Sequence, residues 1–184
     1  MDFSKELYEL DHMQQIYATL FSLANKVQIV GDSYFEKLTS RQFMTMLAVL
    51  HLPENKATIN NISKKLGTSK QNTKQLINSI EKKGYIKVSP STTDKRALNV
   101  TITESGLDVM NECGKIGMHF MAHLFHEFSG EELVLLKRLL LKLYIFDGQP
   151  IDGFEEDVST KTQVSSEDQL ITLQEFSKLR KNPK

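Results

Sequence analysis

The sequence of 184 residues has one cysteine, no long apolar run and no net charge. The single Cys113 excludes an intramolecular disulfide and a four-cysteine zinc site. No uninterrupted apolar run approaches the roughly 20 residues that a membrane-spanning helix needs. The first six residues also lack the basic cap and apolar stretch of a signal peptide. We therefore expect a cytoplasmic protein with no membrane partner.

The motifs of common enzyme classes are absent as well. The sequence has no G-x-G-x-x-G or P-loop for nucleotides, no H-E-x-x-H for zinc and no G-x-S-x-G for a nucleophilic serine. We therefore expect a protein that is not an enzyme and that uses no cofactor. Hydrophobic residues nevertheless make up 40% of the chain, which is enough to bury a real core.

Apolar residues recur at three- and four-residue steps along most of the chain, which predicts a mainly helical protein. One helix should begin after Thr39 or Ser40 and end before Pro53. Another should begin after Thr103 and continue to a break at Ser129. The remaining helices are expected at 4–30, 59–66, 69–83 and 131–146, with a weak terminal helix at 167–180.

From Tyr85 the apolar period changes from 3.6 to 2, which predicts a β-hairpin over about 85–102. Its expected tip is polar and basic. Together with the helices, this hairpin predicts a mainly α fold with a small β-wing, in the α+β class.

The helices expected at 59–66 and 69–83 are joined by a tight turn containing Gly67, which indicates a helix-turn-helix. The second helix turns its apolar residues inward, so its polar face is free to contact DNA. Lysine reaches phosphate or guanine, glutamine and asparagine pair with adenine, and an arginine on a thin tip can enter the minor groove. The expected DNA-binding residues are Ser69, Lys70, Gln71, Asn72, Lys74, Gln75 and Asn78 on the helix, and Asp94, Lys95 and Arg96 on the hairpin tip.

The net charge of zero hides a strong segregation of charge. Residues 40–103 hold eleven Lys and Arg against three Asp and Glu, a balance of +8. Residues 1–39 balance to −3 and residues 104–184 to −5. Phosphate neutralisation drives most non-specific DNA affinity, so this segregation favours a DNA partner.

Five short motifs follow one another in this region: INNISKKLG at 59–67, SKQNT at 69–73, IEKKGYI at 80–86, DKR at 94–96 and ITESG at 102–106. As a set, in this order and spacing, they resemble the MarR family of bacterial winged-helix transcriptional regulators. The resemblance covers about 5–147. It does not cover the tail at 148–184, whose polar, acidic composition predicts a linker or a disordered segment apart from the weak terminal helix.

The resemblance implies a division of the chain and a mode of action. It implies that 5–38 and 104–147 form a helical dimerisation domain and that 39–103 is a winged helix-turn-helix domain that binds double-stranded DNA. It further implies a homodimer on a palindromic operator, usually as a repressor, whose DNA affinity is modulated by a small aromatic or anionic effector. A winged-helix protein-interaction module, with the acidic tail recruiting a partner, remains an alternative function.

Some residues suggest other chemistry. His119 and His123 have the i, i+4 spacing of zinc ligands, and His126 lies three residues further on, but a polar or pocket-lining face is the favoured interpretation. Cys113 lies among apolar neighbours, which favours a small buried hydrophobe over a redox sensor. A zinc- or redox-responsive member of the same family is a further alternative function. Core packing is favoured over an effector pocket for Met44, Met46, Met110, Met118, Phe120, Met121 and Phe125.

Overall fold

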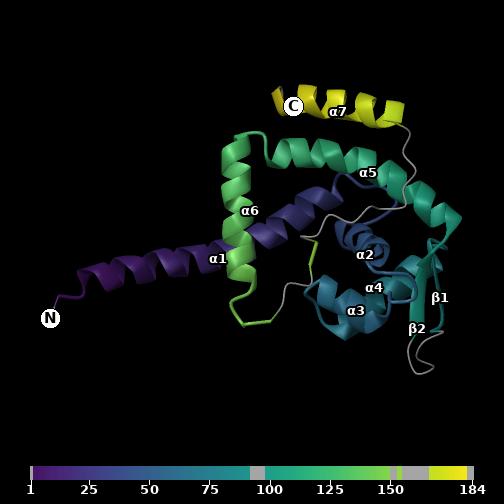
Figure 1. The fold of residues 1–184 in the computed structure, drawn as a ribbon, viewed down its shortest axis with the longest axis horizontal. Coiled ribbons are helices and arrows are strands. Elements are labelled where there is room, and N and C mark those ends of the chain that lie inside the picture. The colour runs from purple at the N-terminus through teal and green to yellow at the C-terminus, as the bar shows by residue number, and fades with distance from the viewer. Residues whose placement is uncertain (1, 92–97, 150–152, 155–165, 182–184) are drawn as a thin grey trace.

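The computed structural model describes residues 2–91, 98–149, 153–154 and 166–181. Over these residues the chain is mostly helical with one two-stranded antiparallel sheet, as the sequence predicts (Figure 1). The elements in chain order are α1 (Ser4–Asp32), α2 (Ser40–His51), α3 (Ile59–Lys65), α4 (Lys70–Lys82), β1 (Ile86–Pro90), β2 (Leu98–Ile102), α5 (Glu104–Leu124), α6 (Gly130–Tyr144) and α7 (Ser166–Lys181).

The core lies between α2, α3, α4, α5 and the sheet. Its most deeply buried side chains are at most 1% exposed, and they include Met46 of α2, Ile62 of α3, Ile77 and Ile80 of α4 and Val100 of β2. Strands β1 and β2 pair with Ile86 opposite Ile102 and Val88 opposite Val100. This register turns one apolar face of the hairpin onto the helices, which anchors the base of the wing.

Side-chain oxygens cap five of the described helices, and the sequence predicts three of these helix starts to within one residue. Thr39 caps α2, Ser69 caps α4 and Thr103 caps α5, each by accepting a hydrogen bond from a first-turn amide. Thr58 and Ser129 do the same for α3 and α6. Each cap satisfies a backbone donor that has no partner within its helix, so the boundaries are set locally.

Two predicted helix boundaries are wrong. Helix α1 does not break at Gly31 but runs on to Asp32, because Gly31 is buried where a Cβ would lie 2.7 Å from Oγ of Ser40. Glycine here permits close packing and does not end the helix. Helix α5 ends at Leu124, several residues before Ser129. Phe125 leaves the helical conformation at φ −114° and ψ 17°, and a turn follows.

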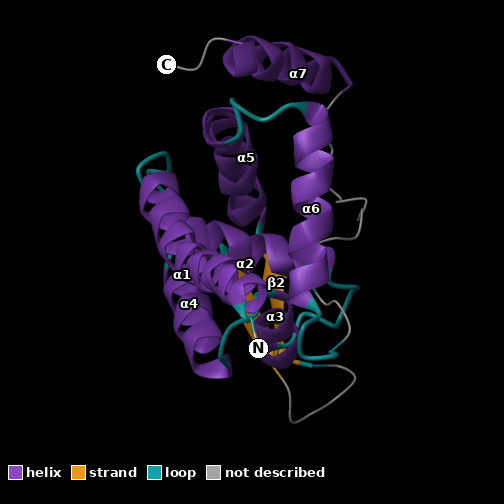
Figure 2. Ribbon diagram, turned by 90° about the vertical axis from the view of Figure 1, so that its left-hand side faces the viewer, coloured by secondary structure: helices purple, strands orange, loops and turns teal. Residues whose placement is uncertain are grey.

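The helices outside this core are poorly covered. Apart from Gly31, no residue of α1 is buried, and α6 has no buried residue at all. Figure 1 shows the N-terminal half of α1 extending away from the rest of the chain, and Figure 2 shows α7 lying across the ends of α5 and α6. Among the described residues, none of the helices is both long and apolar enough to cross a membrane.

Candidate nucleic-acid interface

Helix α4 separates a buried apolar face from an exposed polar one. Thr73, Ile77 and Ile80 are at most 1% exposed, and Leu76 is half-buried. The predicted contact residues on α4 and at its N-cap are all exposed: Ser69, Lys70, Gln71, Asn72, Lys74, Gln75 and Asn78. The cap at Ser69, which accepts a hydrogen bond from the amide of Asn72 at 3.2 Å, starts α4 where this polar face begins. The structure thus brings seven predicted residues together on one accessible surface.

A buried glutamine of α2, which the sequence analysis did not single out, holds α4 in place. Gln42 is 6% exposed, and its Nε2 donates to Oγ of Ser79 at 2.7 Å. Its Oε1 accepts from the amide of Thr39 and from Nζ of Lys83 at 3.1 and 2.9 Å. Thr39 and Gln42 have the spacing of a capping box, so this part of the network was visible in the sequence. The bonds to Ser79 and Lys83 exist only in the folded chain.

The wing is tied to α4 by its base. Oε1 of Glu81 accepts a hydrogen bond from the amide of Val88 at 2.9 Å, which joins the end of α4 to β1. Val100 of β2 donates its amide to the carbonyl of Ala57 at 2.9 Å, which joins the sheet to the start of α3. The predicted tip residues Asp94, Lys95 and Arg96 lie outside the described residues, so their role stays a prediction.

Exposed lysines lie on α4 and on two elements that contact it, α3 and β1. Lys64 lies on α3, Lys70 and Lys74 on α4, and Lys87 on β1, all exposed. Lys65 differs because it is only 9% exposed. The positive charge of residues 40–103 is therefore largely available to a polyanion beside the exposed amides and hydroxyls.

An apolar cavity of about 780 Å³ lies behind α4, between α1, α2 and α5. Met44, Met118, Phe120 and Met121 line it, whereas Met46 and Met110 belong to the hydrophobic core. A second cavity, of about 700 Å³, lies between α3 and α6 and includes Phe125. The Met and Phe set that the sequence favoured as core is therefore divided between core and cavity walls.

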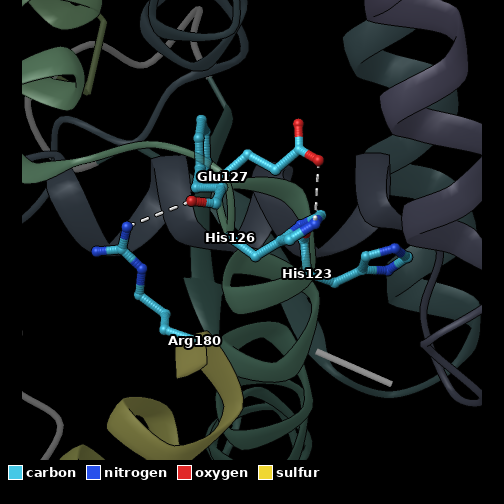
Figure 3. A network of polar contacts seen from close by, with 5 residues as sticks. His123, His126, Glu127 and Arg180 are labelled. Carbon is cyan, nitrogen blue, oxygen red and sulfur yellow. Dashed lines mark hydrogen bonds and ion pairs between the residues drawn. The ribbon is translucent and has the colours of Figure 1, made fainter. Parts of the chain in front are cut away.

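The histidines of α5 and the turn after it contact other groups. Nδ1 of His123 lies 2.7 Å from the hydroxyl of Tyr34, and Nδ1 of His126 lies 2.7 Å from the carbonyl of His123. Nε2 of His126 is 3.7 Å from a carboxylate oxygen of Glu127 (Figure 3). Within the described part of the chain, no three His, Cys, Asp or Glu side chains are grouped as metal ligands. The described residues therefore provide no third ligand for a zinc site at His119 and His123.

Cys113 is 2% exposed, as expected for a small buried hydrophobe. Burial, and to a smaller degree the neighbouring Glu112, raise the pKa of its thiol, while Lys37 acts in the opposite direction. A raised pKa disfavours the thiolate, which is the form that reacts with oxidants.

Comparison with known proteins identifies this arrangement. Residues 37–97 match the model of the MarR family. The fold is similar to the DNA complex of MepR from S. aureus, at 24% identity and a TM-score of 0.62, covering 70% of this chain and 96% of that one. A MarR/EmrR family transcriptional regulator from Acinetobacter sp. ADP1 matches at 24% identity and a TM-score of 0.65, covering 74% and 97%.

A third structure describes the regulation of DNA binding of BpsR from Bordetella bronchiseptica by 6-hydroxynicotinic acid. It matches at 19% identity and a TM-score of 0.61, covering 71% of this chain and 98% of that one. At these identities the structural matches establish the fold, and the matched segment spans the helix-turn-helix and the first strand of the wing. The chain therefore has a winged helix-turn-helix fold shared with MarR-family structures, and its residues 37–97 match the model of that family.

Proposed function

We propose that the protein is a dimeric transcriptional regulator that represses by occupying a palindromic operator, and that a small effector modulates its DNA affinity. The exposed polar face of α4, which carries Lys70 and Lys74 and lies opposite the side buried in the core, is the observation that carries this proposal. Such a regulator acts on genomic DNA in the bacterial cytoplasm.

The dimensions of α4 suit a major groove. Its thirteen residues give about 20 Å of helix at about 1.5 Å per residue. Exposed Gln71, Asn72, Gln75 and Asn78 supply the amides that pair with adenine, and Lys74 reaches phosphate or guanine. MepR, which shares the fold, has been crystallised with DNA. We infer the same mode of binding here.

Dimerisation is proposed from apolar surface that the single chain leaves uncovered. On α1, Leu7 is 65% exposed and Phe21 62%, and on α6, Val134 is 71% and Leu139 51% exposed. Large apolar patches of this kind mark interaction surfaces, because burial is worth about 25 cal/mol per Å² of apolar area. A second copy of the chain would cover the patches on both helices and place two α4 helices on one duplex.

The effector is proposed to occupy the cavity behind α4. The walls of this cavity are mostly apolar and include residues of α1, α2, α4 and α5, so a bound molecule would contact all four helices. A ligand there can change DNA affinity only if it binds one arrangement of these helices better than another. BpsR, with the same fold, is regulated by an aromatic acid, which supports a ligand of small aromatic or anionic character.

Selection of bound fragments from the source genome tests the DNA proposal. We expect a palindromic site whose affinity falls steeply with salt, and weaker binding for Lys74→Ala but not for Lys115→Ala, an exposed lysine of α5. Absence of any salt-dependent DNA binding would overturn the proposal. A protein partner retained at high salt would then favour the protein-interaction alternative.

Sedimentation of the purified chain tests the dimer. We expect Leu139→Glu to shift the protein towards monomer, because it introduces a charge into the proposed apolar contact. Lys142→Glu, on the same helix, changes charge without removing an apolar group and serves as the control. A wild-type protein that sediments as a monomer at micromolar concentration would contradict the proposal.

A further inference from the structure

Gly153, in the chain after α6, contacts the DNA-binding lobe at a buried lysine of α3. Nζ of Lys65, at the end of α3, donates a hydrogen bond to the carbonyl of Gly153 at 2.6 Å, across 88 residues of sequence. Lys65 is 9% exposed, and Gly153 is also buried. A buried ammonium is costly unless polar groups surround it, so this bond is a structural link between the two segments.

The next residue, Phe154, places its ring beside the same lysine. Nζ of Lys65 lies 5.8 Å from the ring centroid, within the range of a cation–π contact. The ring also packs edge-on against His51 of α2, with 5.4 Å between centroids. Phe154 therefore contacts α2 and α3 at once, both of which belong to the winged helix-turn-helix.

Phe154 also lies at the boundary between the two cavities. Three residues line both of them: Leu66, Gly67 and Phe154. Leu66 and Gly67 directly follow α3, whereas Phe154 comes from the segment after α6. Removal of its ring would open the effector cavity behind α4 towards the space between α3 and α6.

His51 reports on this contact. Burial, and then the positive charge of Lys65, lower the pKa of its imidazole. Its Nδ1 is buried and has no hydrogen-bond partner among the described residues. Water entering the site would hydrate this nitrogen and relieve the desolvation, so the pKa of His51 changes with the position of Phe154.

We propose that Gly153 and Phe154 form an intramolecular latch, which Lys65 holds against the DNA-binding lobe and which separates the effector cavity behind α4 from the space between α3 and α6. This proposal rests on the proposed function, because it takes the cavity behind α4 as the effector site. A ligand that extends from the cavity behind α4 into the second cavity must displace Phe154. The apparent affinity for the ligand is then reduced by the fraction of molecules in which the latch is open. The tail after α6 thereby sets the effector concentration at which the regulator responds.

Binding of 8-anilinonaphthalene-1-sulfonate, an aromatic anion, to the full chain measures the latch. We expect Phe154→Ala to bind this probe about fivefold more tightly, the factor that corresponds to the loss of one cation–π contact. Phe146→Ala is the matched control, because Phe146 is 84% exposed and precedes Phe154 by only eight residues. Equal probe affinities for wild type and Phe154→Ala would overturn the proposal.

Titration of the His51 imidazole by nuclear magnetic resonance gives a second readout, with the resonance assigned by His51→Gln. We expect its pKa to rise in Phe154→Ala through hydration and in Lys65→Met through loss of the positive charge, but not in Phe146→Ala. If Lys65→Met fails to fold, the pKa of His51 in Phe154→Ala still tests the latch. An unchanged His51 pKa in Phe154→Ala would also contradict the latch.

The operator affinity of the same variants separates this proposal from the function on which it rests. If Phe154→Ala changes the probe affinity and the His51 titration but the wild type binds no DNA, the latch stands and the regulatory function fails. If the wild type binds DNA and neither readout responds to Phe154→Ala, the function stands and the latch fails.

Discussion

Gln42 of α2 and Ser79 of α4 are joined by a hydrogen bond of 2.7 Å between Nε2 and Oγ. Gln42 also accepts from Nζ of Lys83, so a single buried side chain fixes α4 against α2 at two points. The orientation of the helix that carries the proposed DNA contacts thus depends on a residue that itself is not exposed to DNA.

We expect Gln42→Leu to lower the free energy of unfolding by about 1–3 kcal/mol, because it leaves buried polar partners unsatisfied. It should also weaken operator binding, since α4 loses two of its attachments. Urea denaturation and a fluorescence DNA titration measure the two effects. Gln174→Leu, at an exposed position of α7, should change neither. Unaltered stability of Gln42→Leu would show that the network is not structurally important.

The close approach of Gly106 to the wing predicts a strongly unequal pair of alanine substitutions. A Cβ at Gly106 would lie 2.0 Å from the carbonyl oxygen of Tyr85, which is backbone and cannot rotate away. Gly106→Ala should therefore destabilise the protein by about 1–3 kcal/mol or more, as measured by thermal or urea unfolding.

Gly114, on the same helix, is the matched control, because a Cβ there would meet nothing within 4 Å. Gly114→Ala should raise stability by about 0.5–1 kcal/mol through the higher helix propensity of alanine. Equal effects of the two substitutions would mean that α5 does not pack against Tyr85 as described.

Burial of Cys113 predicts a pH dependence at the alkaline end. Its pKa is raised above the ordinary value of 9.0, so the folded protein retains the proton after the unfolded thiol has lost it. The unfolded state then binds fewer protons, and the free energy of unfolding falls as the pH rises above about 9. Cys113→Ser should remove this slope in urea denaturation measured between pH 8 and 10.

The same burial predicts slow alkylation. Native protein at pH 8 should react with iodoacetamide much more slowly than urea-unfolded protein, as mass spectrometry would measure. Comparable rates in both states would contradict a buried thiol and would reopen the redox hypothesis.

Two kinds of lysine and arginine substitution distinguish phosphate contacts from groove contacts. Lys70→Ala and Lys74→Ala should each lower the slope of log affinity against log salt by about 1, uniformly across DNA sequences. Arg96→Ala, on the predicted wing tip, should cost about 1–3 kcal/mol of binding free energy and relax sequence preference. An unchanged salt slope for Lys74→Ala would exclude a phosphate contact at that residue.

The sequence predicted local structure wherever the signal was itself local. The caps at Thr39, Ser69 and Thr103 depend on hydrogen bonds within one helical turn, so side-chain identity and spacing located the three helix starts to within one residue. The polar face of α4 followed from helical periodicity in the same way, and the structure confirms it. The predicted end of α5 was wrong, because apolar residues continue at helical spacing past Leu124 although the helix itself ends there.

Tertiary structure decided what depends on contacts between distant segments. Arg180 of α7 donates to the carbonyls of Phe125 and Phe128 in the turn after α5, and no pattern near Leu124 signals this contact. The sequence predicted the tail around Phe154 only by its polar composition, whereas the structure shows that residue packed against His51. Periodicity and capping are properties of neighbouring residues. The burial of a single ring or ammonium is determined by which distant surfaces the folded chain brings together.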